Sequence, residues 1–99
     1  MTAGFEWDPA KRLVNLRKHG IDFVRAVQIF EGFVTQRTDT RRDYGEERIL
    51  VVGLVDQLIL VLVYAPRGSM LRIISARRAN DREARAYRAV RSPEASGPD

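Results

Sequence analysis

The chain has 99 residues, of which 44% are hydrophobic and 30% are charged, and its formal net charge is +4. This size fits one domain, which we place at residues 1–91 with a flexible tail at 92–99, and the composition excludes a wholly disordered chain. The lack of cysteine and the single histidine, His19, exclude a disulfide framework and make a zinc centre improbable, so no cofactor is expected.

The first residues contain no basic stretch followed by an apolar one, so no secretory signal is predicted. The longest apolar run is Leu58–Ala65, far below the roughly 20 residues that a membrane-spanning helix needs. We therefore expect a cytoplasmic protein that does not bind membranes.

The N-terminal part of the chain predicts a short strand and then a helix. Phe5-Glu6-Trp7 alternates apolar and charged residues, as a strand does. Asp8 and Pro9 suit the cap and first position of a helix that ends at Gly20. We expect Leu13 and Leu16 to form the apolar side of this helix.

A second helix is predicted from a cap at Asp22 to Gly32. Its apolar residues recur at the spacing of a helix face that packs on a core, and they are Phe23, Ala26, Val27 and Phe30. A strand is expected at 33–37, and the polar stretch 38–48 reads as a loop or a hairpin edge.

The next segment predicts three strands of a meander. Ile49–Val55 and Leu58–Tyr64 are apolar runs joined by two residues, as in a tight hairpin, and their lack of alternation indicates central strands. Met70–Ala76 is the third run. A last helix should start at a cap formed by Asn80, with Tyr87 and Val90 packed inward.

This order of elements predicts an α+β fold with an antiparallel sheet of four to five strands. We expect the two N-terminal helices on one face of the sheet, together with a C-terminal helix elsewhere. The other face would be partly open, and the arginine-bearing strand ends would border it.

Positive charge is concentrated near the C-terminus. From Arg67 to Arg91 there are eight arginines and two acids, a local net charge of +6. Guanidinium groups pair with phosphate oxygens through two hydrogen bonds and do not lose their charge, so this pattern favours a protein that binds phosphates. The alternative is a solvated basic helix face.

Cleavage of RNA without a metal needs a proton acceptor for the ribose 2′-hydroxyl, a proton donor for the leaving oxygen and positive charge near phosphorus. Histidine is the residue type whose ordinary pKa lies nearest neutrality, so His19 is the first candidate, with capping of its helix as the alternative. The second proton carrier would be Glu47, Lys18 or Tyr64. The extra negative charge that develops on phosphorus would be stabilised by Arg67, Arg72 or Arg77.

RNA flanking the cleavage site would be bound by a second set of side chains. Tyr44 could stack on a base, as Trp7 could, although packing suits Trp7 better. The acidic residues around Tyr44 do not have the spacing of metal ligands, and we expect them to form salt bridges with arginines. The candidates for RNA binding are Arg72, Arg78, Arg82, Tyr44 and Arg42.

Arg72 and Arg77 lie five positions apart, so in a regular strand they point to opposite faces. They can serve one site only if the strand bulges or ends before Arg77. We favour the second possibility, with the strand ending at Ser75-Ala76.

Four segments taken together carry a resemblance to a known family: Phe5-Glu6-Trp7-Asp8-Pro9-Ala10-Lys11, Asn15-Leu16-Arg17-Lys18-His19-Gly20-Ile21-Asp22-Phe23, Asp43-Tyr44-Gly45-Glu46-Glu47-Arg48 and Arg72-Ile73-Ile74-Ser75-Ala76-Arg77. In these segments the chain resembles the BrnT family of type II toxin-antitoxin toxins. The resemblance runs from about Phe5 to Tyr87.

The resemblance implies a RelE-like fold and a ribonuclease activity that inhibits translation. It also implies neutralisation by a BrnA-like antitoxin with a ribbon-helix-helix domain, and repression of the operon through operator DNA bound by the complex. RelE-like folds generally use basic residues and a tyrosine, and the nearest matches are Lys18, Arg67, Arg72, Arg77 and Tyr64.

One position departs from the pattern of the family. The usual Ser-Ala-Arg-Lys reads Ser75-Ala76-Arg77-Arg78 here, which replaces a side chain of adjustable pKa by one that stays charged. The leading hypothesis is a metal-independent endoribonuclease with RNA as substrate. The alternative is a non-catalytic co-repressor module that binds nucleic acid or a partner.

Overall fold

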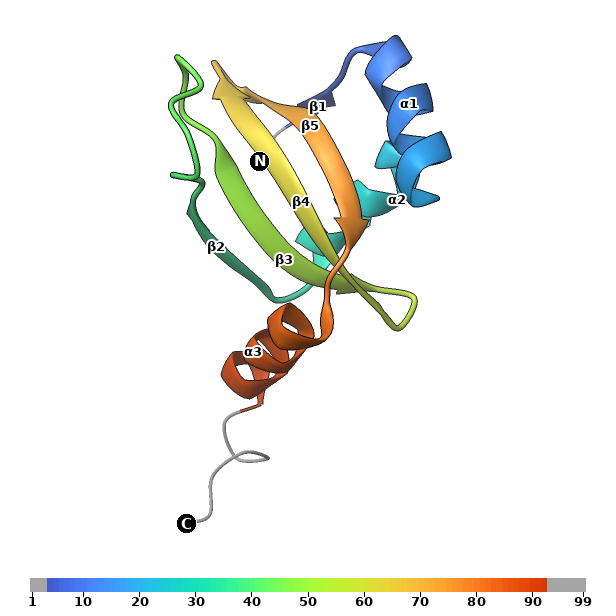
Figure 1. The fold of residues 1–99 in the computed structure, drawn as a ribbon, viewed down its shortest axis with the longest axis vertical. Coiled ribbons are helices and arrows are strands. Elements are labelled where there is room, and N and C mark those ends of the chain that lie inside the picture. The colour runs from blue at the N-terminus through green and yellow to red at the C-terminus, as the bar shows by residue number, and fades with distance from the viewer. Residues whose placement is uncertain (1–3, 93–99) are drawn as a thin grey trace.

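A computed structural model describes residues 4–92 of the chain, and the expectation of a flexible tail at 92–99 falls almost wholly outside these residues. Within these residues, five strands and three α-helices follow one another, with one 3₁₀ helix, η1 (Figure 1). Their bounds are β1 Gly4–Glu6, α1 Pro9–His19, α2 Phe23–Ala26, η1 Val27–Glu31, β2 Val34–Thr38, β3 Ile49–Val55, β4 Leu58–Arg67, β5 Met70–Arg78 and α3 Asp81–Arg91.

The strands form one sheet in the order β1-β5-β4-β3-β2. Strands β2 to β5 are antiparallel neighbours, whereas β1 pairs with β5 in parallel, with Glu6 opposite Arg72. The α+β class and the number of strands are confirmed. The expectation of a purely antiparallel sheet is wrong, because β1 joins the sheet edge beside a strand that runs in its own direction.

The predicted helix ends are confirmed by their caps. The Asp8 carboxylate accepts a hydrogen bond of 2.8 Å from the Ala10 amide, and Gly20 ends α1 with a φ of 71°. At the start of α3, the Asn80 and Glu83 side chains each accept from the other's backbone amide. The predicted hairpin turn also forms, with positive φ angles at Asp56 and Gln57.

The second predicted helix is shorter than expected. Four residues of α2 lead into the tighter turn η1, which ends with a hydrogen bond from the Gly32 amide to the Ile29 carbonyl. Ile29 is fully buried, and a Cβ on Gly53 of β3 would come within 2.7 Å of the Ile29 Cβ. The missing side chain of Gly53 therefore lets η1 pack directly onto the sheet.

One face of the sheet is covered by α2 and η1, and Figure 1 shows these elements behind the strands. We call it the helix-covered face and define it by its buried sheet residues Val51, Leu60, Leu62, Ile73 and Ala76. Aromatic rings extend this core: Phe30 contacts both Phe5 and Tyr64, and Trp7 packs on Phe23.

Helix α1 lies beside β5, at one side of the sheet (Figure 1). The buried Asn15 amide donates 2.8 Å to the Ala76 carbonyl and accepts 3.1 Å from the Ala76 amide, so it replaces a neighbouring strand at this edge. Leu13 and Leu16 are exposed at 52% and 38%. The expectation that they form the packed side of α1 is wrong, because a polar side chain makes the contact.

Helix α3 covers one end of the opposite face. Its Tyr87 is buried, as predicted, against Leu50 and Val52, and the Tyr87 hydroxyl donates 2.8 Å to the Phe33 carbonyl. Val90 is 57% exposed, so its predicted inward packing is wrong. Val90 lies one turn beyond Tyr87, closer to the end of the helix. None of the helices in residues 4–92 is long and apolar enough to span a membrane.

Candidate functional site

An irregularity in β5 decides where its arginines point. Val63 pairs with Ser75 and Tyr64 pairs with Ile73, so Ile74 is an extra residue on β5, a β-bulge. Strand alternation restarts after the bulge. The expected strand end at Ser75-Ala76 is therefore wrong, and the alternative of a bulge is what the structure contains.

The bulge brings Arg72 and Arg77 to the same face. Arg72 pairs with Ala65 and Arg77 pairs with Val61, and these partners are four residues apart on β4. Residues separated by an even number along a strand share a face. From the spacing of β4, the two arginines are separated by about 13 Å along the sheet.

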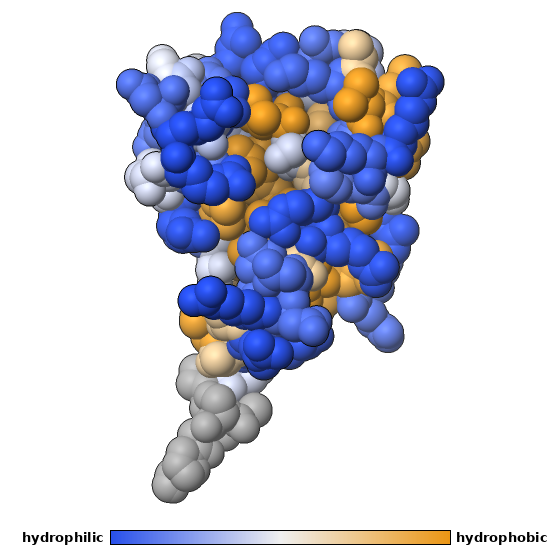
Figure 2. Space-filling model, in the orientation of Figure 1, coloured by the Kyte–Doolittle hydropathy of each residue, from blue (hydrophilic) through white to orange (hydrophobic). Residues whose placement is uncertain are grey.

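The alternation of side chains along the paired strands assigns further residues to the face that carries Arg72 and Arg77. This face lies opposite the helix-covered face. We call it the arginine face and define it by Glu6, Val63, Arg67, Arg72, Ser75 and Arg77. In Figure 2, which has the orientation of Figure 1, apolar side chains lie between groups of hydrophilic ones. Cationic groups thus surround an apolar floor, an arrangement suited to nucleic acid.

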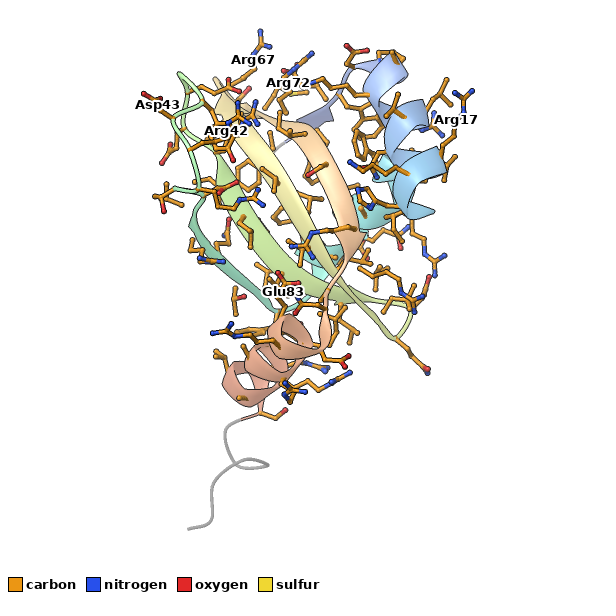
Figure 3. The ribbon with its side chains drawn as sticks, viewed as in Figure 1. Arg17, Arg42, Asp43, Arg67, Arg72 and Glu83 are labelled. Atoms are coloured by element: carbon orange, nitrogen blue, oxygen red, sulfur yellow. The ribbon has the colours of Figure 1, made fainter. Side chains whose placement is uncertain are left out.

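At one end of the arginine face, the Glu6 carboxylate lies between two guanidinium groups. It is 3.6 Å from Arg67 and 3.5 Å from Arg72, and Figure 3 shows both arginines at the same end of the sheet. One carboxylate shared by two guanidiniums leaves most of their N–H donors available. This end of the face keeps a net positive charge.

At the other end, Arg77 donates two hydrogen bonds of 2.9 and 2.8 Å to Glu83 at the start of α3. These bonds lower the pKa of Glu83 to about 2, and they raise the pKa of Arg77. The neighbouring positive charge of Arg41 acts on Arg77 in the opposite direction. Arg77 is therefore held in place as a cation.

Sequence reasoning missed Arg41 as a site residue. Its guanidinium makes two hydrogen bonds of 2.8 and 2.7 Å with Asp39, whose side chain is only 1% exposed. These bonds lower the pKa of Asp39 to about 2. The signal in the sequence was an aspartate two residues before an arginine, a spacing that allows the side chain to bond the backbone amide, as it does here.

Tyr44 and Arg42 lie in the same loop. The Tyr44 hydroxyl donates 3.2 Å to Asp39, and the Arg48 guanidinium lies 4.1 Å from the centre of its ring. Arg42 lies 5.6 Å from that centre, and Figure 3 shows it on the sheet side of the loop, with Asp43 pointing away. The ring already stacks with guanidinium groups, so a base would have to displace one to stack on it.

His19 and Lys18 line a groove of about 330 Å³ between α1 and β5. The strand side of the groove is formed by the bulge residue Ile74 and by Ser75. Since Ser75 belongs to the arginine face, the groove opens beside that face. The structure thus places His19 and Lys18 next to the strand that carries Arg72 and Arg77.

Tyr64 and Glu47 belong to the other side of the sheet. Tyr64 packs edge-on against Phe30, and its hydroxyl donates 2.9 Å to Gln36. Burial raises the pKa of Tyr64, and the negative charge of Glu47 adds to that effect. The sheet separates this pair from Arg72 and Arg77.

Arg78 and Arg82 lie away from these groups. Arg78 lines a hollow of about 230 Å³ between the turn after β3 and α3, with Asp81 and Arg88. Arg82 is exposed on α3. Within residues 4–92, no group of three or more histidine, aspartate or glutamate side chains is arranged to hold a metal ion.

Comparison with known proteins assigns the family. Residues 7–83 match the sequence model of a family described as the ribonuclease toxin, BrnT, of type II toxin-antitoxin systems. No curated protein sequence gives a significant match. The matched region contains α1, the whole sheet except β1, and the start of α3. The chain therefore belongs to the BrnT family of ribonuclease toxins of type II toxin-antitoxin systems.

Proposed function

We propose that this toxin is a metal-independent endoribonuclease that binds RNA across the arginine face and so inhibits translation. The observation that carries the proposal is the bulge at Ile74, which puts Arg72 and Arg77 on one face with Arg67. Three cations from two strands then surround a single strip of sheet. A site of this kind stabilises the extra negative charge that develops on phosphorus during cleavage.

The proton transfers are assigned to the groove beside that face. His19 takes the proton of the 2′-hydroxyl, whose oxygen attacks phosphorus, and Lys18 gives a proton to the leaving 5′-oxygen as its bond to phosphorus breaks. The products are a 2′,3′-cyclic phosphate and a 5′-hydroxyl. We prefer this pair to Tyr64 and Glu47, because the sheet lies between those two side chains and the arginines.

The proposed independence from metal ions is supported by the partners of the carboxylates. Glu6 contacts Arg67 and Arg72, Asp39 is held by Arg41, and Glu83 is held by Arg77. In this proposal, guanidinium groups supply the positive charge that a metal ion supplies in other nucleases.

Flanking RNA would be bound by the loop 39–48 and by α3. Arg42 extends from the loop toward the arginine face, and the ring of Tyr44 lies beneath Arg48. Arg78 and Arg82 would contact phosphates only on a longer RNA that reaches α3.

A toxin of this class acts with an antitoxin. We propose that the antitoxin is BrnA-like, that its ribbon-helix-helix domain makes the complex bind operator DNA, and that the pair represses its own operon in the cytoplasm. The α+β architecture is compatible with the RelE-like fold that the resemblance implies. Acidic side chains of the antitoxin would neutralise the arginine face.

The activity is tested by incubating the purified protein with single-stranded RNA in EDTA. The expected products carry 2′,3′-cyclic phosphate ends. Intact RNA after incubation with an excess of folded protein would contradict the proposal, and cleavage that requires added Mg²⁺ would contradict its metal independence.

The second candidate is a non-catalytic co-repressor module. It is favoured by the ion pairs of the arginines, since Arg77 and Arg41 are each held by a carboxylate through two hydrogen bonds. For such a module, affinity for nucleic acid falls steeply with salt and His19→Ala changes nothing. For the enzyme, His19→Ala lowers cleavage by about 10²-fold and leaves binding largely intact.

A further inference from the structure

We propose that the groove between α1 and β5 is a nucleobase subsite, which holds the base of the nucleotide on the 5′ side of the cleaved phosphate. This inference rests on the proposed ribonuclease function and adds where the substrate is recognised. The volume of about 330 Å³ lies at the lower end of the range for small-molecule pockets, which fits one nucleoside.

The groove has the chemistry that a base requires. Val14 on α1 and Ile74 on β5 give it apolar walls, against which the flat face of a base can pack. The Ser75 hydroxyl and the His19 imidazole can form hydrogen bonds with the edge of a base or with the ribose. Lys18 at the rim adds positive charge for the adjoining phosphate.

The bulge sets the position of the groove relative to the arginines. Ile74 and Ser75, which form the strand side of the groove, lie between Arg72 and Arg77 on β5. A nucleotide whose base enters the groove therefore has its phosphates directed toward the arginine face. The ribose is then next to His19, where the proposed proton transfer takes place.

The groove is held open by a side chain that takes no part in recognition. The Asn15 amide donates 2.8 Å to the Ala76 carbonyl and 3.0 Å to the Ile21 carbonyl, so both of its N–H donors are used. Its oxygen accepts from the Ala76 amide. These bonds fix the distance between α1 and β5, and a preformed site loses less entropy when it binds.

The test measures binding separately from cleavage. The probe is a trinucleotide with 2′-O-methyl riboses, which cannot be cleaved, together with three derivatives that each lack one base. Fluorescence anisotropy at low salt gives their affinities for the full chain. One abasic derivative is expected to bind about tenfold more weakly than the intact probe.

Two α1 variants form a matched pair. Val14 lines the groove and is 58% exposed, whereas Leu13 is 52% exposed and does not line it. Val14→Asn is expected to weaken binding of the intact probe about fivefold and to leave binding of the critical abasic derivative unchanged. Leu13→Asn should bind all four probes as the unmodified protein does.

Equal affinity of the protein for all four probes would overturn the subsite. It would also be overturned if Val14→Asn and Leu13→Asn bound the four probes with the same affinities while both kept the melting temperature of the parent. Failure of the ribonuclease proposal can be distinguished from failure of the subsite. If RNA stays intact in EDTA while the base-dependent binding is seen, the activity is wrong and the subsite stands. If RNA is cleaved and Val14→Asn has the KM of the parent, the subsite is wrong and the activity stands.

Discussion

The two faces of the sheet are built by the same strands and have opposite character. On the helix-covered face, α2 and η1 bury Val51, Leu60 and Leu62 in an apolar core. On the arginine face, α3 covers one end only, and arginines from β4 and β5 surround the remainder. The helix-covered face is therefore closed by its apolar core, whereas the arginine face is open wherever α3 does not cover it.

The comparison separates the candidate catalytic residues into two groups. Arg67, Arg72 and Arg77 share the arginine face, and His19 lies in the groove beside it. Tyr64 packs with the core aromatics on the helix-covered face. Substitutions on the two sides of the sheet should therefore differ in kind, with losses of activity on one side and losses of stability on the other.

The largest effect is expected for Arg72→Ala, because Arg72 would contact the phosphate as its charge increases. We expect kcat to fall by about 10²- to 10³-fold, with a smaller change in RNA affinity. Tyr64→Phe, on the other side of the sheet, should keep kcat within about threefold. Single-turnover cleavage of a labelled RNA measures both, and the reverse ranking would move the site to the helix-covered face.

His19→Ala should follow, with kcat lower by about 10²-fold and with affinity for the uncleavable trinucleotide lowered by no more than about threefold, because His19 is one of several groups that line the groove. Arg17→Ala is the matched control, since Arg17 is on the same helix and points away from the sheet in Figure 3. If the two variants cleave RNA at the same rate, His19 takes no part in the chemistry.

Gly53→Ala tests the helix-covered face. The added Cβ would lie 2.7 Å from the Ile29 Cβ and 3.0 Å from Cγ1 of Val34, so η1 must move away from β3. We expect the free energy of unfolding to fall by about 2–3 kcal/mol, measured by urea denaturation. Activity at a temperature where the variant is folded should be kept, and a variant as stable as the parent would disprove the close packing.

The smallest effect is expected for Asp39→Asn at acidic pH. The pKa values of Asp39 and Glu83 are about 2 in the folded protein, below their ordinary values of 3.8 and 4.5. Their contribution to stability is therefore complete above about pH 5 and is lost as the pH falls through 4 toward 2.

Because the introduced asparagine side chain does not titrate, the Asp39→Asn variant should be less stable by about 1–2 kcal/mol at pH 7 and should lose less stability than the parent between pH 5 and 2. Thermal unfolding across this range measures the slope. Parallel curves for the two proteins would show that the Asp39–Arg41 pair does not contribute.

Local signals predicted the elements well. Caps at Asp8 and Asn80 and the hairpin at 56–57 depend on neighbouring residues, which the sequence displays directly. The bulge at Ile74 could not be located, because it depends on how β5 aligns with β4. The position of α1 was missed for a similar reason, since Asn15 bonds with Ala76, 61 residues away.

For the candidate site, the sequence located the arginines but not the faces on which they lie. The concentration of arginine pointed to the strands that carry Arg67, Arg72 and Arg77, and strand parity identified the conflict between Arg72 and Arg77 that the bulge resolves. Parity alone did not show that Tyr64 would face α2 and η1, because the register of the sheet was unknown. Arg41 was missed because its importance comes from the buried partner Asp39 rather than from its own position.

The most direct test is to map where RNA binds. Backbone amide shifts of the ¹⁵N-labelled protein would be followed as the uncleavable trinucleotide is added. We predict that the changes centre on Arg72, Ser75 and Arg77, and extend to Lys18 across the groove. Changes centred on Gln36, Glu47 and Tyr64 instead would contradict RNA binding at the arginine face.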